Sequence, residues 1–176
     1  MKLTFLSFPF LSFPFFLFLF FLLQKCVIKF SGKPYPVELH KLLAKAQMAP
    51  KLFGYQEFSG VHVVVMELLE EAAHFNPKTA DDSLKEKVRA AVKLMHDDGW
   101  VHGDLRDANI LVKNGKVYLI DFEWAGKPDI VNPPRYPASL NEQIWTEQVR
   151  IQKGISPGGC ITKGHDDYML SRLLGH

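Results

Sequence analysis

The hydrophobic positions along the chain change their spacing several times, and each spacing predicts an element. Residues 26–30 (CVIKF) are a short β-branched stretch, and the turn-forming residues 31–34 close it, so we expect a strand. Apolar residues then recur at helical spacing between Pro36, which suits a first helical turn, and Pro50, which stops a helix. Residues 61–69 (VHVVVMELL) form an unbroken valine-rich run that predicts a largely buried strand.

The second half of the chain carries further cap and turn signals. Ser83 and Glu86 are spaced as a capping box and Gly99 is typical of a helix end, so a helix is predicted between them. Apolar stretches on either side of Asn114-Gly115 predict a hairpin over residues 110–120. Two further helices are expected, at residues 140–151 and 166–174.

Residues 3–23 differ from everything that follows. They carry no charge and hold nine of the 14 phenylalanines, and the run is long enough to cross the hydrocarbon core of a bilayer. The lysines that follow it favour a cytosolic C-terminal part. A cleaved signal peptide and a low-complexity extension from a mistaken gene model are the alternatives, although the small-residue cleavage pattern is lacking. We therefore expect a membrane anchor with the rest of the chain cytosolic, or a cytoplasmic protein if the run is an artefact.

Composition and charge narrow the class of partner. The 176 residues are enough for one compact domain, and 47% of them are hydrophobic. The 21 basic and 19 acidic residues are interspersed, so nucleic acid is not expected as a partner. Cys26 and Cys160 stand apart from each other and from any C-x-x-C pair, so neither a disulfide framework nor a zinc site is indicated.

Candidate chemistry lies on either side of the predicted hairpin. Residues 102–109 (HGDLRDAN) precede it and Asp121, in the triplet DFE, follows it. The hairpin folds Asp121 back beside the preceding loop, so its carboxylate can meet the side chains of Asp104 and Asn109. Phosphoryl transfer needs a carboxylate that orients the attacking hydroxyl and oxygen ligands that hold magnesium against the phosphates. The pattern therefore indicates phosphoryl transfer.

HGDLRDAN followed by DFE resembles the catalytic loop and the D-F-G motif of the protein-kinase-like superfamily. The closest overall likeness is to short kinase-like proteins common in fungal genomes. It implies an α+β, bilobal kinase-like fold, truncated at both ends, with an N-terminal hydrophobic segment. The chain then divides into an anchor or signal segment, 1–24, and a kinase-like domain, 25–176. Within the domain, a remnant N-lobe covers 25–70 and a reduced C-lobe covers 71–176.

The resemblance implies roles for several residues of HGDLRDAN and for two aspartates that follow it. Asp104 would be the catalytic base, Arg106 an electrostatic helper near the transferred phosphate, and His102 a brace for the loop. Asn109 and Asp121 would bind Mg2+, and both would thereby also belong to the nucleotide-binding site. The aspartate at the predicted last helix, Asp166, would support the catalytic loop from below.

The resemblance also implies a nucleotide site, so ATP and Mg2+ are the expected cofactors. Lys29 would hold the phosphates of ATP, with Glu38 on the following helix as its acidic partner. Met66 would be the gatekeeper, and the backbone of Glu67 and Leu69 would meet adenine.

Three departures from the family pattern bear on activity. No glycine-rich phosphate loop precedes Lys29, Glu123 replaces the glycine of D-F-G, and the chain ends soon after the Asp166 helix. The expected function is ATP- and Mg2+-dependent phosphoryl transfer to a hydroxyl, first of all on a protein. A pseudokinase that binds without turnover and a small-molecule phosphotransferase of the aminoglycoside or choline type are the alternatives.

Overall fold

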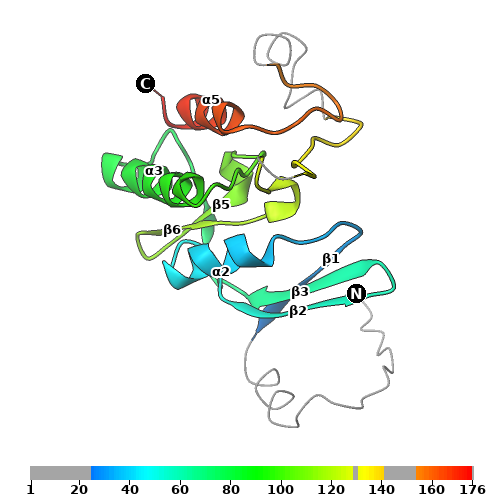
Figure 1. The fold of residues 1–176 in the computed structure, drawn as a ribbon. Coiled ribbons are helices and arrows are strands. Elements are labelled where there is room, and N and C mark those ends of the chain that lie inside the picture. The colour runs from blue at the N-terminus through cyan, green and yellow to red at the C-terminus, as the bar shows by residue number, and fades with distance from the viewer. Residues whose placement is uncertain (1–24, 129–130, 141–153, 176) are drawn as a thin grey trace.

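The computed structural model describes residues 25–128, 131–140 and 154–175, which form two small antiparallel sheets and three α-helices (Figure 1). The first sheet has the strand order β1-β3-β2, with Lys29 of β1 beside Val64 of β3. Its elements are β1 (Cys26–Ser31), α2 (Val37–Lys45), β2 (Leu52–Phe58) and β3 (Val61–Glu67).

The second sheet has the order β4-β5-β6, and the remaining helices lie on the same side of the molecule as this sheet. In Figure 1 the first sheet is at one end, followed by α2, the second sheet, α3 and finally α5. The elements are β4 (Ala73–His74), α3 (Asp82–Asp97), the 3-10 turn η1 (Asp107–Asn109), β5 (Ile110–Lys113), β6 (Lys116–Leu119), the 3-10 turn η2 (Phe122–Trp124) and α5 (Lys163–Leu174).

Two hairpins have the left-handed turns that fit the twist of their strands. Asn114 and Gly115 have φ of 51° and 69°, as a type I′ turn requires, so the predicted hairpin is confirmed. Ser59 and Gly60 have φ of 51° and 78° and join β2 to β3 in the same way. Strand β2 was not predicted, because this edge strand is largely exposed and lacks an apolar alternation.

Helix α3 begins earlier than its sequence signal indicated. The N-cap is Asp81, whose Oδ1 accepts a hydrogen bond from the Leu84 N–H at 2.8 Å, so the predicted cap at Ser83 is wrong. Either residue can cap a helix, and the earlier one places Leu84 on the side packed against the core. At the other end Gly99 has φ of 83°, and its N–H donates to the His96 carbonyl, as predicted for a helix end.

The core is continuous between the helices and the two sheets. Helix α2 turns Leu39, His40 and Leu43 inward, and α3 contributes Val88 and Met95, all with no exposed surface. Fully burying one such aliphatic side chain stabilises the fold by roughly 1.5–3 kcal/mol. This inner stripe therefore fixes which face of α2 looks toward the centre of the molecule.

Some predictions concern residues outside the described part. The segment 1–24 and residues 141–153, which include nearly all of the helix predicted at 140–151, are among them. The proposed division into lobes at residue 70 stays a prediction. The mixture of α-helices with short antiparallel strands is confirmed.

The expected membrane-anchored localisation is corrected. The predicted span, residues 3–23, lies outside the described residues. Across 25–128, 131–140 and 154–175, no helix combines the length and the apolar character needed to cross a bilayer. The longest helix there, α3, has 16 residues and carries several charges.

Candidate active site

Asp166, in the first turn of α5, holds residues 102–109, which we call the catalytic loop. Its buried carboxylate accepts hydrogen bonds from the His102 N–H at Oδ2 (2.7 Å) and from the Gly103 N–H at Oδ1 (2.8 Å). Nε2 of His96, on α3, lies 3.1 Å from the same Oδ2. Hydrogen bonds to a carboxylate are about twice as strong as neutral ones. The Asp166 carboxylate therefore ties α3 and α5 to the loop. The arrangement is the one that the kinase resemblance implied for Asp166.

Gly103 is required by the path of the catalytic loop. Its φ is +81°, a left-handed conformation that side chains disfavour. A Cβ atom there would lie 2.8 Å from Cδ1 of Ile161 and 3.3 Å from Cβ of Trp124. Any larger residue would therefore have to displace the Ile161 side chain as well as adopt this strained backbone conformation.

His102 is fully buried and binds only the protein around it. Its Nε2–H donates to the Ile120 carbonyl (3.2 Å), and its Nδ1 accepts from the Asp104 N–H (3.3 Å). The ring packs against Phe122, with 5.5 Å between centroids. His102 thus links the catalytic loop to the strand end before Asp121, which suits the predicted bracing role and leaves it out of contact with a substrate.

Asp104 presents one free carboxylate oxygen. Its Oδ2 accepts hydrogen bonds from Nε of Arg106 (3.1 Å) and Nδ2 of Asn109 (2.7 Å), and among the described residues nothing donates to its Oδ1. Burial raises the pKa of this carboxyl above its usual range, while Arg106, Asn109 and His102 act in the opposite direction. An elevated pKa on a fixed carboxylate suits a group that accepts a proton during catalysis.

Asn109 and Asp121 offer oxygen atoms beside Asp104. The Asn109 amide nitrogen also donates to the Asp104 carbonyl (2.9 Å), while its buried Oδ1 accepts nothing from the rest of the described chain. Asp121 has φ of 66° and ψ of 63° and is the N-cap of η2. Its charge is near enough to raise the Asp104 pKa further.

The donor set fits magnesium. No group of three or more His, Cys, Asp or Glu able to hold a metal occurs in the described ranges. Magnesium is usually bound by one or two carboxylates, water and the phosphates of its substrate, so it needs no such cage. The Asn109 Oδ1, which accepts nothing from the described residues, and the Asp121 carboxylate are suitable ligands for it.

Lys29 and Glu38 do not meet in this structure, which corrects the predicted ion pair. Nζ of Lys29 lies 2.5 Å from Oδ1 of Asp121 and 3.1 Å from Oε1 of Glu123. Glu38 is 73% exposed and pairs instead with Lys41 on its own helix (2.9 Å). The reason is the orientation of α2, whose inner stripe begins at Leu39 and leaves Glu38 facing solvent.

The predicted gatekeeper, Met66, and the two residues whose backbone was predicted to meet adenine, Glu67 and Leu69, lie at the end of β3 and just after it. Met66 packs against the core and Leu69 is 9% exposed. The Glu67 N–H donates to the Lys51 carbonyl (2.9 Å), so this backbone donor is occupied. The Leu69 N–H donates to no other described residue, which leaves it available to a ligand. Adenine binding at these positions stays a prediction.

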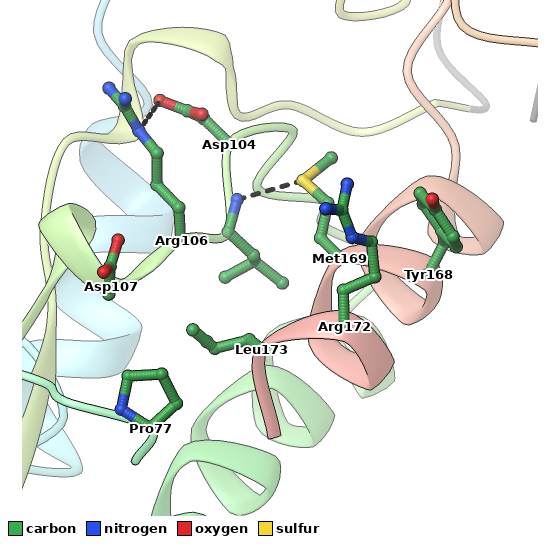
Figure 2. A pocket seen from close by; sticks show the side chains of 9 residues that line it. Pro77, Asp104, Arg106, Asp107, Tyr168, Met169, Arg172 and Leu173 are labelled. Atoms are coloured by element: carbon green, nitrogen blue, oxygen red, sulfur yellow. Dashed lines mark hydrogen bonds and ion pairs between the residues drawn. The ribbon is translucent and has the colours of Figure 1, made fainter. Parts of the chain in front are cut away.

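A pocket of about 250 Å3 opens between the catalytic loop and α5 (Figure 2). Its inner wall is apolar and includes Leu105 and Met169, while charged side chains of both elements stand at its edge. Figure 2 shows the Asp104–Arg106 ion pair at one side and Arg172, over Tyr168, at the other. The lining residues are Pro77, Asp104, Leu105, Arg106, Asp107, Tyr168, Met169, Arg172 and Leu173.

Sequence reasoning missed a ring cluster that joins α2 to η2. His40 and His102 lie on two sides of Phe122, at 5.4 and 5.5 Å between centroids, and Tyr35 is 6.5 Å away. His40 Nε2–H donates to the Pro50 carbonyl and Nδ1 accepts from the Tyr35 hydroxyl, both at 2.8 Å. Burial lowers the His40 pKa, in keeping with a neutral ring. The sequence signal that could have shown the burial of His40 is its helical spacing from the inward leucines of α2.

Comparison with known proteins gives independent information about this arrangement. The family model of the RIO domain matches residues 37–130, just over half of the chain, including the catalytic loop and η2 but not β1. The chain is similar to the lipopolysaccharide core heptose(II) kinase WaaY of Escherichia coli, at 30% identity over 64 residues. It is also similar to the KEOPS complex subunit Bud32 of Pyrococcus abyssi, at 32% identity over 74 residues.

These alignments cover parts of longer proteins. The match to WaaY takes in 36% of this chain and 28% of that protein, and the match to Bud32 takes in 39% and 34%. The solved structure of the Cydia pomonella granulovirus kinase PK-1 is similar with a TM-score of 0.59, covering 86% of this chain and 60% of that one. At 16% identity this likeness shows the fold alone, and it confirms the mixed kinase-like architecture.

Proposed function

This chain belongs to the RIO domain family, within the protein-kinase-like superfamily, and from that premise we propose that it transfers the γ-phosphoryl group of ATP to a hydroxyl, with Mg2+ as cofactor. The observation that carries the proposal is the free Oδ1 of Asp104. One carboxylate oxygen is held by Arg106 and Asn109, so the other has a fixed position from which to bind an incoming hydroxyl.

In the proposed reaction Asp104 orients the acceptor hydroxyl and receives its proton at Oδ1. The acceptor oxygen bonds to the γ-phosphorus, the bond from that phosphorus to the β–γ bridging oxygen breaks, and ADP leaves. Arg106 keeps its contact with Asp104 and adds positive charge beside the transferred group.

Lys29, Asn109 and Asp121 form the nucleotide side of the proposed site. Lys29 holds the phosphates, and the Asn109 Oδ1 with the Asp121 carboxylate would hold magnesium. Bound magnesium supplies charge neutralisation on the phosphate oxygens. In this proposal Met66 is the gatekeeper and the backbone of Glu67 and Leu69 meets adenine. The Leu69 N–H, which donates to no other described residue, serves as a hydrogen-bond donor.

We place the acceptor in the pocket between the catalytic loop and α5 (Figure 2). Asp104 lies at its edge, and about 250 Å3 holds one amino-acid side chain or one sugar ring. A hydroxyl on a protein is our first candidate. A small-molecule acceptor is the second, favoured by the heptose kinase among the similar proteins.

The test is phosphate transfer from radiolabelled ATP to a protein panel and to a panel of sugars and alcohols. Asp104→Asn should abolish transfer yet keep the stabilisation by ATP and Mg2+, which reaches about 2.7 kcal/mol at 100 times Kd. Asp121→Asn should weaken both. If the wild-type protein binds ATP but transfers phosphate to no acceptor, and Asp104→Asn behaves the same in every assay, the enzyme proposal fails. The chain would then be a binding module.

A further inference from the structure

We propose that Glu123, the residue that replaces the D-F-G glycine, is the positioning residue for Lys29, in place of an acid on α2. This inference rests on the proposed nucleotide site, in which Lys29 holds the phosphates. It assigns a function to the position at which the chain departs most clearly from the family pattern.

The contacts of Lys29 are the first support. Its ammonium group reaches two carboxylates, Oδ1 of Asp121 at 2.5 Å and Oε1 of Glu123 at 3.1 Å. The lysine side chain is 26% exposed and the glutamate 35%, so both are partly shielded from water. A partly shielded ion pair orders its side chains more than one in free solvent does.

Helix α2 has no acid that can take this part. One helical turn before His40, on the same inward face, stands Pro36, just before the first residue of the helix. Glu38 is directed to solvent and is engaged with Lys41. The inward face of α2 therefore meets η2 through the His40 ring and offers no carboxylate to Lys29.

The turn η2 directs Glu123 toward β1. Phe122 is buried, with 1% of its surface exposed, among the rings of His40, His102 and Tyr35. With this side chain anchored inward, its two neighbours in sequence, the N-cap Asp121 and Glu123 of the turn, both reach Lys29. Glu123 is not among the residues with positive φ, so its backbone does not need glycine.

Two carboxylates on one lysine allow a division of tasks. In the proposed site Asp121 turns to magnesium when nucleotide binds, and Lys29 would then lose a partner. Glu123 keeps the ammonium group in place during that exchange.

The decisive comparison is Glu123→Gln against Glu38→Gln, each measured for Kd of ATP at saturating Mg2+ by calorimetry. We expect Glu123→Gln to raise Kd about twofold to fivefold, the upper part of the range for one partly shielded charge pair. Glu123→Asp should recover part of the loss, and Glu38→Gln should bind like wild type. Equal Kd values for wild type and Glu123→Gln, or a loss with Glu38→Gln alone, would overturn the proposal.

A magnesium titration separates positioning from metal binding. If Glu123 acts through Lys29, the Mg2+ concentration for half-maximal nucleotide binding stays unchanged in Glu123→Gln and rises in Asp121→Asn. A rise of the same size in Glu123→Gln would make Glu123 a metal ligand and contradict the assignment.

A double-mutant cycle tests the pair without nucleotide. The thermal unfolding shifts of Lys29→Met and Glu123→Gln should sum to more than the shift of the double variant, because either change alone breaks the same contact. Additive shifts would show that Lys29 and Glu123 do not interact, and they would overturn the proposal even if the protein fails to bind ATP. Coupled shifts with no ATP binding by wild type would instead reject the proposed function and leave the pair standing.

Discussion

The catalytic loop and the first sheet meet at one site but are held in different ways. In the loop, His102, Asp104 and Asn109 are all at most 7% exposed, and a buried carboxylate from α5 binds its backbone. In the sheet, one face is open to solvent, with Ile28 53% and Phe30 65% exposed. The loop therefore has a defined shape before any ligand arrives. The Lys29 side chain of β1, in contrast, is held in position mainly by its ion pairs. Changes in the loop should cost folding stability, and changes on the open face of the sheet should not.

Asp166→Ala should have the largest effect, because it removes the acceptor of two buried backbone N–H groups. Each buried donor without a partner costs about 1–3 kcal/mol, so we expect a loss of about 3 kcal/mol or more in the free energy of unfolding. Urea unfolding measures it. The control is the next residue, Asp167, which is exposed, so Asp167→Ala should change stability by less than about 0.5 kcal/mol. Similar losses in both variants would remove the distinction drawn for the loop.

Gly103→Ala should come next, at about 2–3 kcal/mol, because it adds a left-handed backbone cost to a clash with Ile161. Gly99→Ala is the matched control, since its φ is +83° but no atom lies within 4 Å of the added Cβ. We expect it to cost only the backbone part, about 1 kcal/mol. Both are read from urea unfolding, and equal losses would show that packing around Gly103 contributes nothing.

Asp104→Asn should stabilise the protein at neutral pH, in spite of its place in the loop. Burial raises the Asp104 pKa in the folded state above the ordinary value of 3.8, so its ionised form opposes folding. That cost is fully present above the folded pKa and disappears as pH falls toward the unfolded value. The difference in unfolding temperature between variant and wild type should therefore shrink as pH is lowered from 7 toward 4. A difference that grows over this range would mean that folding lowers the Asp104 pKa.

Phe30→Thr should have the smallest effect, within about 0.5 kcal/mol, because its side chain stands on the open face of β1. Val64→Ala, on the neighbouring strand but with no exposed surface, should cost about 1.5–3 kcal/mol by the same unfolding measurement. The pair tests whether only one face of this sheet supports the fold. A large loss with Phe30→Thr would mean that the outer face is covered.

Much of the loop and its surroundings could be predicted because the signals are local. Asn114-Gly115 specifies its own turn, Gly99 its own helix end, and the HGDLRDAN and DFE blocks their own family. The edge strand β2 could not be found, since its residues are mostly exposed and follow no apolar alternation. The Ser59-Gly60 turn, which joins β2 to β3, is the one local signal at its end.

The partner of Lys29 could not be predicted for a different reason. Choosing between Glu38 and Glu123 requires the rotation of α2 about its axis, which depends on long-range packing of Leu39 and Leu43. Glu38 is nearer to Lys29 in sequence. It also lies on the following helix, where the kinase resemblance implies the acidic partner of the lysine. The substitution at Glu123 was interpreted only as a loss, although a charged residue beside Asp121 was also a possible partner.

The hydrogen bonds that Asp166 accepts from the catalytic loop determine when, during synthesis, the loop can take its shape. Their donor and acceptor residues are 64 and 63 positions apart in sequence. While the ribosome is still translating that interval, the nascent chain already contains His102, Asp104 and Asn109 but lacks the carboxylate that holds their backbone. The hairpin and α3 can form as soon as they leave the exit tunnel, because their contacts are closer in sequence. The catalytic loop is thus among the last parts to acquire its shape, and a chain whose translation stops before residue 166 has all three of these side chains without a site.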